Sequence, residues 1–201
     1  MRIYLTRHGE TKWNAEGRMQ GWLNSNLTEK GIANARKLGE HLKHINFDYV
    51  CCSPLGRAKE TASHVIGNKT TQIVYNEAFK EMNFGKWEGM MHEDVKDQYA
   101  EQQHNFWNAP HLFETIDGES YELFIDRIRK GIEGLILDNK SKNILLVTHA
   151  AVIKAIFTII EKRSLEDFWA PPFIYDTCLS IFELENGQIR VLMEPDISHL
   201  E

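Results

Sequence analysis

The sequence predicts an α/β fold, a three-layer α/β/α sandwich built around a mostly parallel central sheet. Short apolar runs of strand length alternate with amphipathic helical segments along the chain. The run NILLVT, at residues 143–148, is apolar almost throughout, as are strands buried on both faces of a parallel sheet. Two strand-like runs near the end flank Asn186-Gly187, a turn signal that predicts an antiparallel edge hairpin.

The first half of the chain begins with the order strand, helix, strand. Residues 2–6 and 49–53 are short, mainly apolar runs bounded by polar residues, and we expect both as buried strands. Between them, Thr28 stands in the N-cap position, and apolar residues recur at helical spacing at Ile32, Ala35, Leu38 and Leu42. This order is the start of an α/β fold.

The alternation continues to the end of the chain. We expect helices at residues 55–66, 121–137 and 150–161, and strands at residues 72–75, 143–148, 178–185 and 188–194. Residues 77–119 lack clean periodicity, which predicts a helical insertion that caps the sheet. With no repeat, linker or low-complexity tract, residues 1–201 are expected to form a single domain.

Composition limits the classes of partner. Hydrophobic residues make up 42% and charged residues 26% of the sequence, as in ordinary globular proteins. The formal net charge of -6 gives no basic face for a phosphate backbone, so no nucleic acid is expected as a partner. A small anion stays open as a ligand, because a local group of arginines can oppose the overall charge.

Cysteine usage and hydropathy predict a cytoplasmic protein. Cys51, Cys52 and Cys178 are odd in number and lack zinc-ligand spacing, which suits buried reduced thiols. Met1 leads directly into the first strand without a secretory signal, and no apolar run approaches the roughly 20 residues of a membrane helix. No membrane partner is therefore expected.

Basic side chains follow three of the predicted strands. Arg7 and His8 follow the first strand, Arg57 lies just after the second, and His149 follows NILLVT. Ligands of open α/β sheets bind beyond the carboxyl ends of the strands, so we expect these side chains to meet in one pocket. A guanidinium matches phosphate oxygens with a planar fork of donors, and a neutral imidazole is a competent nucleophile toward phosphorus. The pattern favours phosphoryl transfer.

Residues after His8 are expected to complete this pocket. Gly9 would let the backbone approach the phosphoryl oxygens closely, and Thr11 and Asn14 offer a hydroxyl and an amide within reach of the same loop. An Arg-His pair alone is more often structural than catalytic. It is the ordered set of such groups along the chain that favours chemistry.

Several sequence blocks together resemble the histidine phosphatase superfamily, the phosphoglycerate mutase-like proteins, and within it the broad-specificity phosphatase branch. The blocks are RHGET (7–11), WN (13–14), GR (17–18), QGW (20–22), LTEKG (27–31), SPLGRA (53–58), TA (61–62), Glu81, FG (84–85), WEG (87–89), GES (118–120) and VTH (147–149). They are spread over nearly all of the chain up to Lys154. A bare RHG would be a weak signal, whereas these ordered blocks are a strong one.

The resemblance implies a role for each matching residue. His8 would accept the phosphoryl group as a phosphohistidine, and Glu81 would be the general acid that protonates the leaving alcohol and then the base that activates water. The phosphoryl oxygens would be held by Arg7, Asn14, Arg57, His149 and Ala150. Further substrate contacts are expected at Gln20, Gly21, Trp107, Phe113 and Ser120. The resemblance implies no cofactor and no metal, which the cationic donors would replace.

Two departures from the family pattern lie beside the expected pocket. Ala150-Ala151 follows His149 where the family commonly has a glycine, although an alanine can still present its backbone amide. Residues 22–26 lack the usual aspartate and proline before the LTEKG block. Neither departure removes a catalytic group.

The insertion is rich in aromatic residues, and most of them are expected to form a small core beneath the helical cap. They are Phe84, Trp87, Tyr99, Phe106, Trp107 and Phe113. Trp107 and Phe113 are kept as candidates for the pocket mouth, where they would grip an apolar or aromatic leaving group. The histidines of the insertion, His92, His104 and His111, show no pattern that predicts a role.

The expected activity is that of a metal-independent histidine acid-type phosphatase, a phosphomonoesterase that acts on small phosphorylated metabolites and releases inorganic phosphate. A phosphoglycerate mutase is the first alternative, but between Asn83 and Ser120 the basic residues are only Lys86 and Lys96, which suits a polyanion poorly. A non-catalytic phospho-ligand binder is the second, and Glu81 argues against it because a carboxylate facing phosphate does not help binding. A homodimer stays open as the only macromolecular assembly.

Overall fold

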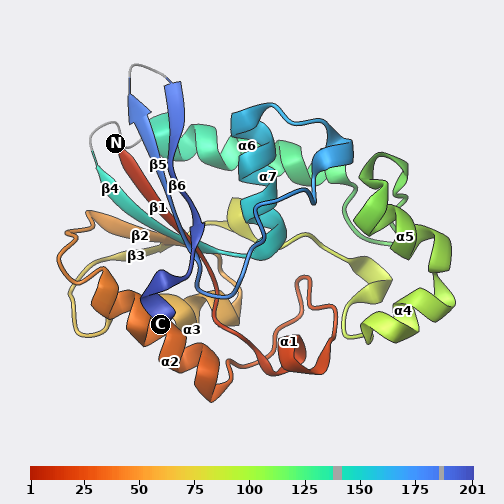
Figure 1. Cartoon of the computed structure of the whole chain (residues 1–201), viewed down its shortest axis with the longest axis horizontal. Coiled ribbons are helices and arrows are strands. Elements are labelled where there is room, and N and C mark those ends of the chain that lie inside the picture. The colour runs from red at the N-terminus through yellow and green to blue at the C-terminus, as the bar shows by residue number, and fades with distance from the viewer. Residues whose placement is uncertain (138–141, 186–187) are drawn as a thin grey trace.

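A computed structural model describes residues 1–137, 142–185 and 188–201 of the chain. Its centre is a six-stranded sheet with the strand order β3-β2-β4-β1-β5-β6 (Figure 1). The strands are β1 (Arg2–Arg7), β2 (Tyr49–Cys52), β3 (Ile73–Tyr75), β4 (Asn143–Thr148), β5 (Leu179–Glu185) and β6 (Gln188–Asp196). Each expected strand is present, with ends within two residues of the expected ones.

Four strands of the sheet are parallel, and their register brings three strand ends together. β1 pairs with β4, and β4 pairs with β2, all in parallel, while β3 extends the sheet beside β2. Arg7 lies opposite Thr148, and Cys52 lies opposite Val147. The residues that follow β1, β2 and β4 therefore emerge at the same edge, where the sequence places its basic side chains.

An antiparallel hairpin completes the sheet. β5 pairs antiparallel with β1, and β6 pairs antiparallel with β5 to form the outer edge. The predicted edge hairpin is thus confirmed in its two strands, whereas the predicted turn at Asn186-Gly187 lies outside the described residues. In Figure 1 this hairpin is blue and lies beside the N-terminal strand.

Helices cover both faces of the sheet. α2 (Glu29–His41) and α3 (Gly56–Ile66) pack on one face, against Tyr4 and Val50, and α6 (Tyr121–Leu137) and α7 (Ala150–Glu161) pack on the other. Alternate residues of one strand serve the two layers, since Ile3 and Leu5 of β1 pack with α6 and α7 while Tyr4 faces α2 and α3. The predicted α/β/α sandwich is confirmed.

The N-cap of α2 is the one expected from sequence. The Thr28 side chain accepts a hydrogen bond from the Gly31 amide, which satisfies a donor of the first turn. The helix runs on to His41 and has Leu42 as its C-cap, in agreement with the helical spacing that extends to Leu42.

The insertion between β3 and α6 is helical, as predicted. It contains the 3-10 helices η1 (Glu77–Phe79), η2 (Gly85–Trp87) and η3 (Pro110–Leu112), and the α-helices α4 (His92–Gln98) and α5 (Ala100–Asn108). α4 and α5 lie together at one end of the molecule, near the short α1 (Lys12–Glu16) that follows β1 (Figure 1). That residues 1–201 form a single domain stays a prediction.

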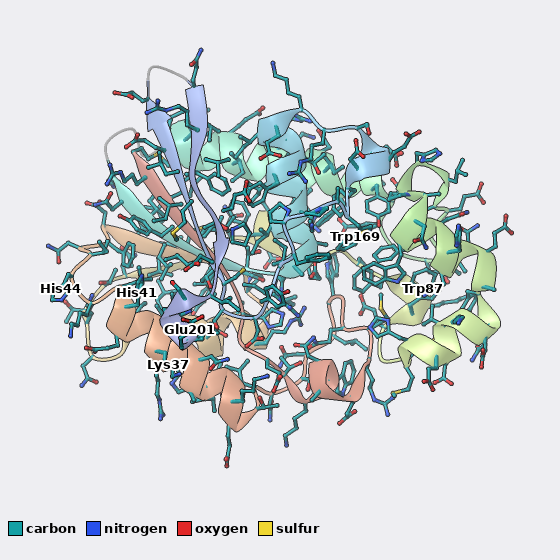
Figure 2. The ribbon with its side chains drawn as sticks, viewed as in Figure 1. Lys37, His41, His44, Trp87, Trp169 and Glu201 are labelled. Carbon is teal, nitrogen blue, oxygen red and sulfur yellow. The ribbon has the colours of Figure 1, made fainter. Side chains whose placement is uncertain are left out.

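The core of the insertion is aromatic and centres on Phe106. Its ring lies 4.8 to 5.7 Å, centroid to centroid, from neighbouring rings. The neighbours are Phe84, Trp87, Trp107, Phe113, Tyr121 and Trp169. Figure 2 shows Trp87 on the side of the insertion and Trp169 nearer the middle of the molecule. Among the described residues, no helix is long and apolar enough to span a membrane.

The loop after β1 rests directly on the first turn of α2. A Cβ added to Gly31 would lie 2.2 Å from the Glu10 carbonyl oxygen, and one added to Gly9 would lie 2.6 Å from the Gly31 carbonyl oxygen. Neither distance is tolerable between unbonded atoms, so both positions require glycine. This backbone contact fixes the position of the loop after β1 relative to α2.

Replacing Gly31 with alanine should destabilise the protein, because the added methyl group must push the loop backbone away. We expect the free energy of unfolding to fall by about 1–3 kcal/mol, as in other overpacked sites. The matched control is Gly134→Ala on α6, where an added Cβ meets no atom within 4 Å. That substitution should stabilise by about 0.5–1 kcal/mol through helix propensity. Urea denaturation measures both, and an equal effect of the two variants would contradict the steric reason.

Candidate active site

A pocket lies beyond the carboxyl ends of β1, β2 and β4, with a volume of about 130 Å³. Most of the residues predicted for the site line it. They are Arg7, His8, Asn14, Gln20, Gly21, Arg57, Glu81, Trp107 and Ala150. Segments far apart in the sequence therefore converge here, as the parallel register of the strands requires.

The imidazole of His8 is held in one orientation. Its Nδ1 lies 2.8 Å from the carbonyl oxygen of Gly9, so Nδ1 carries the proton and donates it to that oxygen. Its Nε2 is 3.1 Å from Arg57 Nε, which can only donate. Nε2 therefore keeps its lone pair, which accepts the hydrogen bond from Arg57 on a buried ring that lines the pocket.

Arg57 is almost fully buried and is oriented by backbone atoms. Its Nη1 and Nη2 donate to the carbonyl oxygens of Leu23 and Gly21, each at 2.8 Å. Its own amide, in the first turn of α3, donates to Asn24 Oδ1 at 2.8 Å. The segment that departs from the family pattern thus holds this arginine. Two of the five N–H donors of Arg57 are not used by these contacts and remain for an anion.

His149 lies behind His8 and does not line the pocket. The two ring centroids are 5.2 Å apart, and His149 Nε2 is 2.7 Å from Ser53 Oγ. His149 is fully buried, and its Nδ1 has no hydrogen-bond partner in the structure. A buried polar atom is normally hydrogen-bonded, and a bound anion, or a proton carried by that anion, would give His149 Nδ1 its missing partner.

Glu81 enters the pocket from the irregular segment between η1 and η2. Its Oε1 accepts from the Met82 amide at 2.9 Å, and its Oε2 accepts from the Ala151 amide at 3.4 Å. The Ala150-Ala151 departure therefore preserves the backbone donor that this position must supply. Ala150 itself begins α7, so the positive end of the helix dipole faces the pocket.

Arg7 and Asn14 complete the polar wall. Arg7 Nη1 donates to the Ile174 carbonyl oxygen at 3.1 Å, and its Nε is buried without a partner. Asn14 Oδ1 accepts from the amide and hydroxyl of Thr11 in a capping box for α1, which directs the amide nitrogen of Asn14 away from Thr11. Thr11 serves this cap rather than the pocket.

Burial sets the charges of the acid and base groups. Desolvation lowers the pKa of His8 and of His149 well below 6.5, and the positive charge of Arg57 lowers both further. Desolvation raises the pKa of Glu81 above its ordinary value, against the opposing effects of the Met82 amide and Arg57. The site therefore combines a neutral imidazole with a carboxyl group whose pKa is raised, next to Arg57, whose pKa is lowered to about 10 and which stays charged at neutral pH.

Gly9 is required by a contact between two elements rather than by a contact with a ligand. It is absent from the pocket wall, and the side where a Cβ would stand faces the Gly31 backbone rather than a ligand. Its amide donates to Thr61 Oγ1 at 3.0 Å. The expectation that Gly9 lets backbone approach a phosphoryl oxygen was therefore wrong, since the close approach is to α2.

The mouth of the pocket is apolar and aromatic. Trp107 and Trp169 contact each other at a tilt of 47° with ring centroids 4.7 Å apart, and Phe84 and Met19 also line the pocket. Trp169 is fixed by its indole N–H, which donates to the Phe106 carbonyl oxygen and to the Tyr121 hydroxyl at 2.7 Å each.

The segment that carries Trp169 is held from below by a buried lysine. Lys154 Nζ donates to the carbonyl oxygens of Ala170, at 2.5 Å, and Pro172, at 2.6 Å. The same segment supplies the Ile174 carbonyl oxygen that Arg7 contacts. Lys154 thereby secures both the aromatic mouth and the partner of a phosphate-side arginine.

The described residues contain no group of three or more His, Cys, Asp and Glu side chains that could hold a metal ion. The three cysteines are free and buried.

The comparisons with known proteins agree with this geometry. A family model described as the histidine phosphatase superfamily (branch 1) matches residues 3–196. This chain belongs to the histidine phosphatase superfamily. Bacillus stearothermophilus YhfR has the same fold, with a TM-score of 0.97 at 37% sequence identity, and the match covers 100% of this chain and 99% of that one.

Curated relatives of this histidine phosphatase include phosphatases and mutases. The adenosylcobalamin/alpha-ribazole phosphatase of Salmonella typhimurium is 34% identical over 84% of each chain. Phosphoserine phosphatase 1 of Hydrogenobacter thermophilus is 28% identical over 85% of this chain and 81% of its own. A 2,3-bisphosphoglycerate-dependent phosphoglycerate mutase from Parvibaculum lavamentivorans is 28% identical over 87% of this chain and 89% of its own.

Two predicted substrate contacts of this histidine phosphatase lie away from the pocket wall. Phe113 packs inside the aromatic core of the insertion, 5.4 Å from Trp87 and 5.2 Å from Phe106. Ser120 precedes α6, where its Oγ accepts from the Leu123 amide at 3.3 Å. The structure does not bring either side chain to the pocket, because both serve the insertion and the helix that follows it.

Six residues that line the pocket were not among the predicted contacts. Phe84 and Ala151 lie in or beside predicted sequence blocks, and the other four are Arg18, Met19, His92 and Trp169. Arg18 and Met19 stand directly before the QGW block, so proximity in sequence could have indicated them. No local pattern could have found Trp169, which lies twenty residues beyond His149 and reaches the pocket through the Lys154 contacts.

The unfolding free energy of this histidine phosphatase should fall as the pH drops below 6.5. His8 and His149 have lower pKa values in the folded state, so below 6.5 the unfolded chain binds more protons. Each contributes up to about 1.4 kcal/mol per pH unit. Glu81 acts in the opposite direction, because a raised pKa gives stability that is lost as pH rises.

Substituting His8 with alanine should remove one of the two histidine contributions and flatten this dependence. Urea denaturation of wild type and His8→Ala at several pH values between 7.5 and 5 measures the slopes. A slope in His8→Ala as steep as that of wild type would contradict the neutral, buried state of His8.

Proposed function

We propose that this protein is a phosphomonoesterase that hydrolyses small phosphorylated metabolites through a phosphohistidine at His8. The observation that carries the proposal is the tautomer of His8. With the Nδ1 proton donated to the Gly9 carbonyl oxygen, the Nε2 lone pair is available in a pocket that also presents Arg7 and Arg57. A neutral nucleophile among cationic donors suits attack on a phosphate ester.

In the first step, His8 Nε2 attacks phosphorus as the bond from phosphorus to the leaving oxygen breaks. The Arg57 Nε–H, which contacts Nε2 when no substrate is present, would turn to a phosphoryl oxygen as the lone pair forms the new bond. Glu81, whose raised pKa favours the protonated form, gives its proton to the leaving alkoxide. Arg7, Asn14 and the Ala150 amide, at the start of α7, hold the charge on the phosphoryl oxygens.

In the second step, the carboxylate of Glu81 accepts a proton from water, which attacks the phosphohistidine and releases inorganic phosphate. The charge stabilisation comes from guanidinium and amide donors, so the proposed reaction requires neither a metal nor a cofactor. His149, buried behind His8 with its Nδ1 unpartnered, is proposed as a further phosphate ligand on a small movement of the ring. A cytoplasmic location and a homodimer stay predictions.

The pocket supports hydrolysis better than the two alternatives. A mutase must hold a second anionic group of its substrate, yet neither Lys86 nor Lys96 lines the pocket, and Arg18 is paired with Glu16 at 2.8 Å. A simple phosphate binder would gain nothing from the buried carboxyl group of Glu81. Isomerisation of 3-phosphoglycerate, primed with the bisphosphate, is the assay that would favour the mutase instead.

Replacing His8 with alanine should lower kcat/KM for p-nitrophenyl phosphate by at least about a thousandfold, because the nucleophile is lost. Steady-state hydrolysis in the presence of a chelator measures this, and wild-type turnover should be unaffected by the chelator. Substantial activity in His8→Ala would contradict the phosphohistidine mechanism. Turnover that the chelator abolishes would contradict the metal-free one.

The aromatic mouth should favour aryl over alkyl phosphate esters. Trp107→Ala should raise KM for phenyl phosphate by roughly fivefold, and for glycerol phosphate by much less, because an aromatic contact is worth about 1 kcal/mol. Phe113→Ala is the matched control from the aromatic core. It should lower the melting temperature while leaving the ratio of the two KM values near that of wild type. Equal KM changes for both esters in Trp107→Ala would contradict a leaving-group contact.

A further inference from the structure

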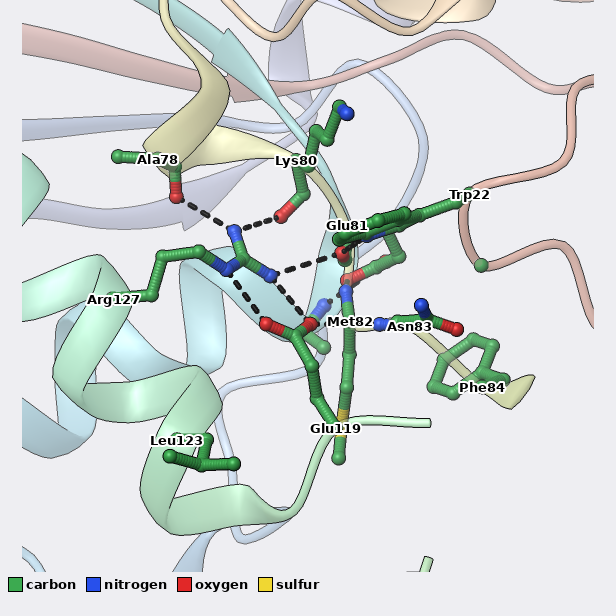
Figure 3. A network of polar contacts seen from close by, with 12 residues as sticks. Trp22, Ala78, Lys80, Glu81, Met82, Asn83, Phe84, Glu119, Leu123 and Arg127 are labelled. Carbon is green, nitrogen blue, oxygen red and sulfur yellow. Dashed lines mark hydrogen bonds and ion pairs between the residues drawn. The ribbon is translucent and has the colours of Figure 1, made fainter. Parts of the chain in front are cut away.

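We propose that Arg127, on α6, positions the carboxyl group of Glu81 for proton transfer by clamping the backbone that carries it. This inference rests on the proposed phosphatase activity. Arg127 does not line the pocket, so it acts on the reaction only through the segment it holds. Figure 3 shows its guanidinium reaching from the helix to that segment.

The segment from Ala78 to Asn83 needs such support. It joins two 3-10 helices and has no regular secondary structure beyond Phe79, so its carbonyl oxygens have no ladder partners. Three of these oxygens accept from Arg127. The Ala78 and Lys80 oxygens lie 2.8 and 2.9 Å from Nη1, and the Glu81 oxygen lies 3.2 Å from Nη2.

Glu119 completes the clamp from the GES block. Its two carboxylate oxygens accept from Arg127 Nε at 2.8 Å and Nη2 at 2.7 Å, a bidentate pair. One of them also accepts from the Asn83 amide at 2.9 Å, and the Glu119 amide donates to the Asn83 carbonyl oxygen at 2.9 Å. All five N–H donors of Arg127 are therefore used, and Glu81 lies between the two ends of the segment that they hold.

The clamp leaves Glu81 few ways to move. Its carbonyl oxygen is held by Arg127 and by Trp22 Nε1, at 2.8 Å, while its carboxyl group turns to the pocket and meets the Met82 and Ala151 amides. General acid catalysis needs the proton donor within hydrogen-bond reach of the leaving oxygen. A shift of the Glu81 backbone would therefore weaken protonation of the leaving group without removing the nucleophile or the phosphate donors.

The test compares two aryl esters that share one ring and differ in the basicity of the leaving phenolate. Phenyl phosphate requires protonation of its leaving oxygen, whereas p-nitrophenyl phosphate scarcely does. We expect Arg127→Met to lower kcat/KM for phenyl phosphate about tenfold more than for p-nitrophenyl phosphate, within the range that general acid catalysis supplies. Arg127→Lys, which keeps the charge but loses the planar fork, should show the same bias to a smaller extent.

A double-mutant cycle shows whether Arg127 acts through Glu81. In the Glu81→Gln background there is no acid left to position, so Arg127→Met should add no further bias between the esters, to within about twofold. Arg129→Met, an exposed arginine two residues further along α6, is the control and should show no bias. If Arg127→Met does not fold, Arg127→Lys carries the same comparison.

Equal slowing of both esters by the Arg127 variants would overturn the proposal, as would an undiminished bias in the Glu81→Gln background. Both outcomes can be told apart from a failure of the proposed function. Wild-type hydrolysis that His8→Ala abolishes supports the phosphatase, and equal slowing in that setting counts against the clamp alone. Absence of wild-type turnover on either ester would overturn both.

Discussion

The active site depends on one contact, the hydrogen bond from Arg57 Nε to His8 Nε2. It requires a cation and a neutral imidazole to lie side by side in a region that excludes water. The cation is tolerable there because the carbonyl oxygens of Gly21 and Leu23 replace its hydration. The imidazole stays neutral first because burial disfavours its charged form, and second because the same cation opposes its protonation. The loop before α2, the start of α3 and the end of β1 are all arranged around this pair.

The parallel sheet makes that arrangement possible, because it brings the ends of several strands to one edge. Strand ends in register deliver groups from distant parts of the chain to one edge without a loop having to order itself around each of them. Each imported group then brings its own anchor, such as the Ser53 hydroxyl for His149 or the Ile174 carbonyl for Arg7. These anchors hold the reactive side chains in fixed positions relative to the core.

The features that could be predicted from sequence are those set by residues close together in the chain. Thr28 could be recognised as a cap because its partner amide lies three residues away, and the residues of the pocket's polar wall could be placed because strand ends are visible in sequence. The role of Gly9 could not, since it is decided by the Gly31 backbone on another element. Trp169 was missed for the same kind of reason, as its place depends on Lys154 and on a loop with no periodicity. Contacts of this kind, between elements far apart in the chain, could not be predicted from the periodicity or spacing of the sequence.

The clamp on the acid segment recognises main-chain oxygens, and every residue has one. The side chains of Ala78 and Lys80 therefore take no part in the hydrogen bonds that Arg127 makes with these two residues. The number of residues between Ala78 and Asn83 is not free, because one residue more or fewer would rotate the Glu81 side chain out of the pocket while the clamp stayed closed. In the segment from Ala78 to Asn83, the clamp constrains the number of residues more than it constrains their side chains.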